Sequence, residues 1–171
     1  MFILKERKEE MKGYQQLGFS INEDSRGNYI PKVQVSMVKE IFVSNTGYSC
    51  SEDVAQCEIV EKELRNSDRE KFICIHFNIK NRIISYEVVS MGSLTSSIVH
   101  PREVFKAAIL ANAASVVFLH NHPSGSTEPS IDDIEITKRL CKAGSILGIN
   151  VLDHLIITTN DYLSFRQKGL L

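Results

Sequence analysis

One stretch of the chain sets the expectations for the fold: His120-Asn121-His122-Pro123-Ser124-Gly125-Ser126-Thr127-Glu128-Pro129-Ser130-Ile131-Asp132-Asp133. The apolar run before it, residues 115–119, is typical of a buried strand, and residues 134–147 have the apolar spacing of a helix. Side chains two apart on a strand point to the same face. His120 and His122 are therefore predicted to aim both imidazoles into one volume at the carboxyl end of the strand.

His120, His122 and Asp133 are candidate metal ligands. Two neutral imidazoles side by side chelate a metal ion, and Asp133, in the first turn of the predicted helix, can supply a third ligand. Three protein ligands leave one tetrahedral position open for water, as in catalytic zinc sites, so we expect one Zn²⁺ per chain. The structural alternative is a capping box, with Ser130 as N-cap and Asp133 at N3, beside a polar strand end.

The spacing of this set resembles a known signature. His-x-His, followed after seven residues by Ser and after two more by Asp, matches the JAMM (MPN-plus) metalloprotease pattern. The fuller string His-Asn-His-Pro-Ser-Gly, with the later Pro-Ser and Asp, resembles the RadC branch of that family. Two further segments, 99–105 and 152–154, extend the resemblance over residues 51–171. It implies an α/β (mixed α+β) fold, a single three-layer JAB/MPN domain with a mixed β-sheet flanked by helices, similar to cytidine deaminases.

The resemblance also implies catalytic residues. The JAMM pattern places a general-base glutamate on an earlier strand, and Glu70 stands at that position, before the predicted strand 72–77. A surface glutamate beside Lys71 is the alternative for Glu70, and Glu103 is a rival base in the predicted helix after Pro101. Ser130 would support the oxyanion as well as cap its helix.

The resemblance therefore implies a zinc-dependent hydrolase that cleaves a peptide or isopeptide bond by a metal-activated water. The alternative is a non-catalytic JAB scaffold or a DNA-repair accessory protein of RadC type. Degenerate JAB domains lose ligands, whereas the four motif positions are present here. A nucleobase deaminase would need His-x-Glu and a later Pro-Cys-x-x-Cys, and the sequence has neither.

Composition limits the partners. The chain has 171 residues and a net charge of −1, so it suits one ordinary domain and has no global basic field, which makes DNA contact only weakly supported. The four cysteines form no Cys-x-x-Cys pair, and no apolar run has signal-peptide or transmembrane length. We therefore expect a cytoplasmic protein with reduced thiols. The sequence identifies neither the peptide or protein substrate nor the oligomeric state.

The rest of the chain predicts the domain layout. Residues 1–45 form an N-terminal extension that is partly strand, and residues 46–171 form the RadC-like JAB/MPN domain. Expected elements are a strand over 33–38, a helix capped by Ser51 and running to Leu64, a hairpin of 72–77 with 82–89, a short strand over 94–99, a helix over 101–111, a strand over 115–120, a helix over 130–147, a strand over 151–158 and a closing segment over 162–171. His76 is expected in the core, His100 at a helix cap and His154 near the metal ligands.

Overall fold

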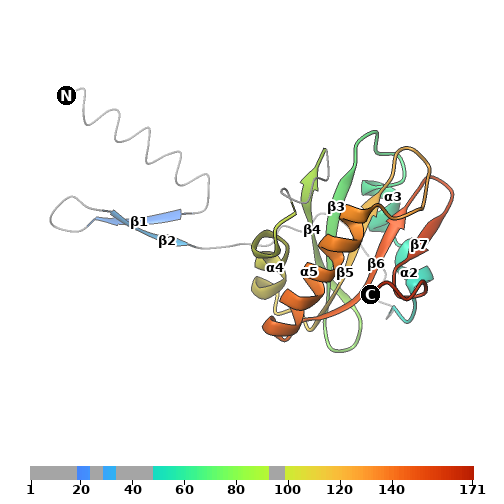
Figure 1. Ribbon diagram of the computed structural model, residues 1–171. Coiled ribbons are helices and arrows are strands. Elements are labelled where there is room, and N and C mark those ends of the chain that lie inside the picture. The colour runs from blue at the N-terminus through green and yellow to red at the C-terminus, as the bar shows by residue number, and fades with distance from the viewer. Residues whose placement is uncertain (1–18, 24–28, 34–47, 93–98) are drawn as a thin grey trace, which may run out of the picture. The chain divides into compact units, whose positions relative to one another are not determined.

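The computed structural model describes residues 19–23, 29–33, 48–92 and 99–171 (Figure 1). The chain divides into two units, Met1–Glu40 and Ile41–Leu171. In the first unit, β1 (Phe19–Glu23) pairs antiparallel with β2 (Tyr29–Val33). Residues 34–38 and 94–98, which hold most of two predicted strands, lie outside the described residues.

The second unit is built on a five-stranded sheet in the order β4-β3-β5-β6-β7. The strands are β3 (Lys71–Phe77), β4 (Ile83–Met91), β5 (Ser115–Asn121), β6 (Asn150–Ile157) and β7 (Tyr162–Ser164). The pair β5–β6 is parallel, because a helix crosses over between the two strands, and the other three pairs are antiparallel. The sheet is mixed, which confirms the predicted fold class.

Helices cover both faces of the sheet and complete a three-layer domain (Figure 1). Their bounds are α2 (Ser51–Ala55), α3 (Glu58–Glu63), α4 (Pro101–Leu110) and α5 (Ile131–Leu147). Alternate residues of β3 serve the two faces: Ile73 and Ile75 pack with α2 and α3, whereas Phe72 packs with α4 and α5. Each large side chain buried in this way stabilises the fold by about 1.5–3 kcal/mol.

The helical region after residue 50 differs from the prediction. Two short helices, α2 and α3, stand where one helix to Leu64 was expected, because the buried Cys57 has extended backbone angles and begins a new helix. The N-cap of α2 is Cys50, not Ser51, since the Asp53 carboxylate accepts hydrogen bonds from the backbone N–H of Ser49 and Cys50. Ser51 Oγ instead donates to Asp153 Oδ2 at 2.6 Å and ties α2 to β6.

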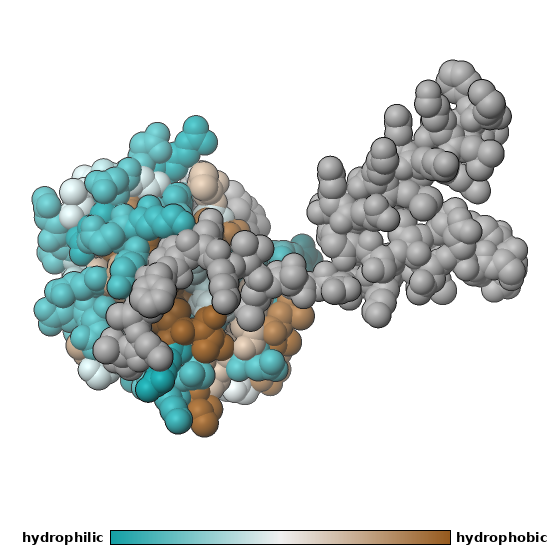
Figure 2. Space-filling view, turned by 180° about the vertical axis from the view of Figure 1, so that it is seen from behind, coloured by the Kyte–Doolittle hydropathy of each residue, from teal (hydrophilic) through white to brown (hydrophobic). Residues whose placement is uncertain are grey.

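The surface of the described residues is largely hydrophilic on the face opposite to that of Figure 1, with apolar residues gathered in part of the view (Figure 2). Exposed apolar side chains include Ile84 and Met91 on β4, at one edge of the sheet. None of the helices that the structure describes is long and apolar enough to cross a membrane.

Candidate metal centre

The candidate centre forms where β5 ends. His120 pairs with Phe72 of β3 and with Ile156 of β6, so its backbone is held on both sides. His122 continues the strand register for one residue, because its backbone N–H donates to the Ile157 carbonyl at 2.9 Å. The imidazoles lie 4.5 Å apart, centroid to centroid, in an edge-to-face arrangement. The structure thus brings the two histidines into one volume, as their spacing requires.

A tight turn follows His122 and folds back onto it. Gly125 N–H donates to the His122 carbonyl at 3.0 Å, and Gly125 has a φ of 82°, a left-handed backbone that glycine adopts without steric cost. The turn places the Ser126 carbonyl oxygen 2.7 Å from His122 Nδ1. A carbonyl can only accept, so Nδ1 donates and Nε2 of His122 is the nitrogen left to face Asp133.

The N-terminus of α5 supplies Asp133. Ser130 is the N-cap, and the predicted capping box is confirmed: Ser130 Oγ accepts from Asp133 N–H at 3.1 Å, and Asp133 Oδ2 accepts from Ser130 N–H at 2.8 Å. Because the cap fixes its rotamer, the Asp133 carboxylate turns back toward β5. Gly148 ends the helix in the left-handed conformation.

Ligand atoms of His120, His122 and Asp133 all lie within 4.8 Å of one another. His120 Nε2 is 3.5 Å from Asp133 Oδ1, and His122 Nε2 is 3.7 Å from Asp133 Oδ2. Tetrahedral ligands at about 2.0–2.1 Å from a zinc ion stand about 3.3–3.4 Å apart. The three ligand atoms are therefore close enough to converge on one divalent ion if their side chains draw together. The capping box and the ligand set use the same carboxylate.

The environment of the three groups suits ligation. Burial lowers the pKa of His120 to about 4, which keeps it neutral. Burial opposes ionisation of Asp133, but the neighbouring His122 and the hydrogen bonds from Ser130 outweigh it and hold the pKa of Asp133 well below its usual range. The Asp133 carboxylate raises the pKa of His122, and the charge of Glu70 raises it further. At a pH below the pKa of His122, a metal ion must therefore displace a proton from His122 when it binds.

Glu70 lies immediately before β3 and is half-buried. Its neighbours on both sides are held by Asn121: the side-chain amide accepts from Lys71 N–H at 2.8 Å and donates to the Arg69 carbonyl at 3.0 Å. The Glu70 carbonyl itself accepts from Gly92 N–H at 2.8 Å. Asn121, which stands between the two histidines, thus fixes the backbone of Glu70 next to them.

The rival glutamate has other partners. Glu103 of α4 lies 3.2 Å from Lys106 Nζ and 3.3 Å from Arg102 Nε, and the hydrogen bond from Lys106 is the main cause that lowers its pKa. Glu70, by contrast, contributes to the charge felt by His122. Of these two glutamates, Glu70 is therefore the one whose charge acts on a candidate ligand.

The remaining histidines occupy the places expected for them. His76 is buried in β3 with Nδ1 2.7 Å from Ser85 Oγ, and His100 caps α4 by accepting from Arg102 N–H at 3.2 Å. His154 lies beside the candidate ligands, with Nε2 3.3 Å from His120 Nδ1, which confirms its expected position. Sequence reasoning does not single out Thr137, whose hydroxyl contacts His154 at 2.6 Å. The one feature of the sequence that points to Thr137 is its position four residues after Asp133, which places both residues on the same helix face.

We expect Ser130→Ala to lower the free energy of unfolding by about 1 kcal/mol, because the Asp133 N–H loses its cap. Denaturant unfolding measures the change. Ser145→Ala, an exposed serine farther along α5, is the control and should cost nothing, since alanine is the better helix former. Equal stability of Ser130→Ala and the unmodified protein would show that the cap does not stabilise α5.

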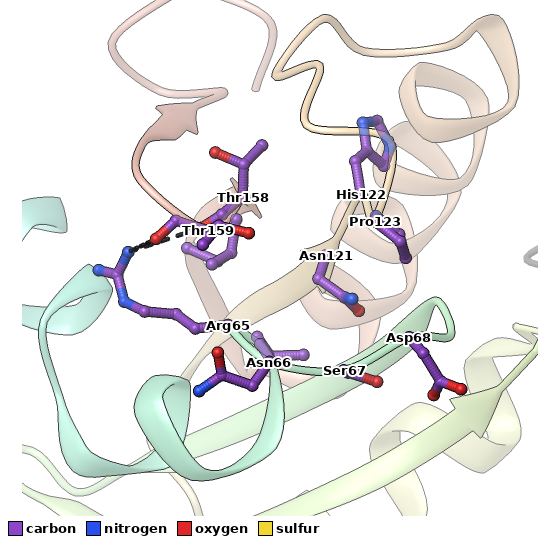
Figure 3. Close-up of a pocket in the computed structure, with 11 residues that line it drawn as sticks. Arg65, Asn66, Ser67, Asp68, Asn121, His122, Pro123, Thr158 and Thr159 are labelled. Carbon is purple, nitrogen blue, oxygen red and sulfur yellow. Dashed lines mark hydrogen bonds between the residues drawn. The ribbon is translucent and has the colours of Figure 1, made fainter.

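A hollow of about 280 Å³ adjoins the candidate ligands (Figure 3). Its walls come from residues 64–68 before β3, 121–123 at the end of β5 and 157–159 at the end of β6, so His122 lies on its border. The Arg65 guanidinium fixes one wall, because it donates to the carbonyls of Thr159 at 3.0 Å and Ala55 at 3.1 Å. The hollow is thus a preformed polar space beside His122.

Comparisons with known proteins agree with this geometry. The profile of a family described as RadC-like JAB domain matches residues 48–170. A UPF0758 protein of Desulforamulus reducens is 52% identical over 122 residues, which cover 71% of this chain and 53% of the relative. A UPF0758 protein of Caldanaerobacter subterraneus subsp. tengcongensis is 46% identical over 142 residues, 81% of this chain and 60% of the relative. This chain spans somewhat more than half the length of these curated relatives.

Proposed function

Because this chain belongs to the RadC-like JAB domain family, we propose that it is a zinc-dependent hydrolase that cleaves a peptide or isopeptide bond. The observation that carries the proposal is the convergence of two imidazole Nε2 atoms and one carboxylate at the end of β5, with Glu70 beside them. Two nitrogen ligands and one oxygen ligand suit zinc better than magnesium or calcium, which prefer oxygen ligands.

The ligand set has the composition of a catalytic centre rather than a structural one. His120, His122 and Asp133 make three protein ligands, whereas structural zinc sites have four, usually with cysteine. A zinc ion bound there would supply a water of lowered pKa and a Lewis acid for the substrate carbonyl. Within the described residues, no cysteine belongs to this group.

Glu70 would act as the general base. Its carboxylate would take a proton from the attacking water and then give that proton to the nitrogen of the leaving amine, the usual double role of a positioned acid–base group. Asn121 holds the Glu70 backbone for this role, because its side chain donates to the Arg69 carbonyl and accepts from the Lys71 N–H. A carboxylate immediately before the neighbouring strand β3 would thus take part in the reaction without being a ligand.

Ser130 would assist the substrate carbonyl. Its hydroxyl donates to Asp133 Oδ2 at 2.6 Å in this structure, so it must turn away from Asp133 before it donates to an oxyanion. The polar hollow beside His122 would hold a residue of the substrate next to the scissile bond. These roles belong to the proposal for this domain, since the longer relatives contain further sequence.

A cleavage screen tests the proposal. Zinc-loaded protein is incubated with a mixture of ordinary and lysine-linked peptides in water enriched in the heavy oxygen isotope, and the products are identified by mass spectrometry. We expect new carboxyl termini that carry the heavy isotope, disappear in chelator and return with added zinc. His122→Ala, purified in the same way, controls for contaminating peptidases. Cleavage that persists in chelator or in His122→Ala would contradict the proposal.

A further inference from the structure

A chain of buried hydrogen bonds runs behind His120. Thr137 Oγ1 lies 2.5 Å from the Asp133 carbonyl oxygen and 2.6 Å from His154 Nδ1. His154 Nε2 lies 3.3 Å from His120 Nδ1. Thr137 and His154 are 0% exposed and His120 is 1% exposed, so water does not compete for these bonds. The chain therefore connects a backbone carbonyl of α5 to the first of the candidate ligands.

Donor and acceptor chemistry fixes the direction of the chain. A carbonyl only accepts, so the single proton of the Thr137 hydroxyl goes to the Asp133 carbonyl, and the hydroxyl oxygen must accept from His154 Nδ1–H. His154 has no contact with solvent, and the cost of burying a charge without an ionic partner keeps its imidazole neutral. Its Nε2 then has a lone pair and accepts from His120 Nδ1–H. The Nε2 atom of His120 is left without a proton and faces Asp133.

We propose that Thr137 and His154 are positioning residues that set the tautomer of His120 and thereby raise the affinity of the site for a divalent ion. The inference rests on the metal site of the proposed function but not on hydrolysis. A histidine ligand usually donates its second ring N–H to a carboxylate, carbonyl or water. Here the neutral imidazole of His154 is the acceptor for the second ring N–H of His120, and Thr137 orients His154.

The helix α5 thus positions two ligands at once. Asp133 presents its carboxylate to the site, and Thr137, one turn later on the same face, orients His120 through His154. Aromatic rings hold His154 in place: it stacks on Phe165 at a centroid distance of 4.6 Å and meets Phe72 edge to face at 5.5 Å. A shift of α5 would therefore disturb both ligands together.

The pair Thr137→Val and Thr137→Ser tests the inference. Valine keeps the shape and removes the hydroxyl, whereas serine keeps the hydroxyl and removes a methyl group. Zinc affinity is measured by competition with a chromophoric chelator, and thermal unfolding checks that both variants fold. We expect zinc affinity to fall by about 10–100-fold in Thr137→Val and to stay near that of the unmodified protein in Thr137→Ser. Equal affinities in the two variants, or unchanged affinity in Thr137→Val, would overturn the inference.

A second measurement needs no variant. Long-range nitrogen–proton NMR spectra of the metal-free protein report which ring nitrogen of each neutral histidine carries the proton. We expect the Nδ1–H tautomer for both His120 and His154, and an Nε2–H tautomer at His120 would contradict the inference. The two proposals fail separately: a protein that binds zinc but cleaves nothing counts against the hydrolase, whereas unaltered zinc affinity in Thr137→Val counts against the hydrogen-bond chain alone.

Discussion

His122→Ala is expected to lose most of the zinc that the unmodified protein binds, about one ion per chain. The change removes one of three converging ligand atoms and leaves His120 Nε2 and Asp133 as an incomplete pair. The loss of affinity should exceed the about 10–100-fold typical of losing a hydrogen-bond partner of a ligand. Elemental analysis after gel filtration and a zinc titration measure it. His100→Ala, at the cap of α4, is the control and should keep its zinc; equal zinc in the two variants would contradict the assignment.

Low pH is expected to weaken the binding of zinc to this site. Asp133 raises the pKa of His122 above its ordinary value, so below that pKa the Nε2 atom holds a proton that zinc must displace. As the pH rises through the pKa of His122, the proton leaves and zinc affinity should increase, then level off. A titration of zinc affinity against pH measures this dependence, and affinity that rises on acidification would contradict it.

Glu70→Gln is expected to lower the rate of cleavage by about 10²–10⁴-fold while zinc stays bound. Glutamine keeps the size of the side chain but cannot accept a proton, and Glu70 is not among the three grouped ligands. Zinc content and cleavage rate are measured on the same sample. Glu103→Gln is the matched control, since Glu103 is paired with Arg102 and Lys106, and it should keep its rate.

Two results for Glu70→Gln and Glu103→Gln would contradict the role given to Glu70. An active Glu70→Gln beside an inactive, zinc-loaded Glu103→Gln would show that the base lies on α4. Loss of zinc from Glu70→Gln would show instead that Glu70 is a ligand. Either result would overturn the role given to Glu70.

The positions of the three candidate ligands are largely predictable from sequence, because they follow from strand alternation and helix capping. The alternation of a strand places His120 and His122 on one face, and the capping box at Ser130 fixes Asp133. Both features depend on residues close together in the chain. The apolar runs over β3, β5 and β6 likewise predict a sheet that is buried on both faces.

The places of Glu70 and His154 follow from the family resemblance and not from local rules, because they depend on contacts between distant segments. The place of Glu70 beside the histidines depends on the antiparallel register that sets Phe72 opposite His120. The contact between His120 and His154 depends on the parallel register of β5 and β6, which pairs Phe118 with His154. Apolar alternation does not specify such registers uniquely when both faces of a sheet are covered by helices.

The helix prediction failed after Ser51 for a related reason. The apolar positions Val54, Ile59 and Val60 suit one helix by spacing, but tertiary packing of α2 and α3 against the sheet breaks it at Cys57. The hydrogen bond from Ser51 to Asp153 is another contact between distant segments, and it removes Ser51 from the capping role. Helical spacing predicts the buried side of such a segment better than it predicts where helices begin.

Anomalous X-ray scattering at the zinc edge, recorded from crystals of the zinc-loaded protein, locates the metal ion and its ligands directly. We expect one strong peak per chain at about 2.0–2.2 Å from His120 Nε2, His122 Nε2 and the Asp133 carboxylate, with Glu70 outside direct ligation. A peak bound by other residues, or no peak in zinc-saturated crystals, would contradict it.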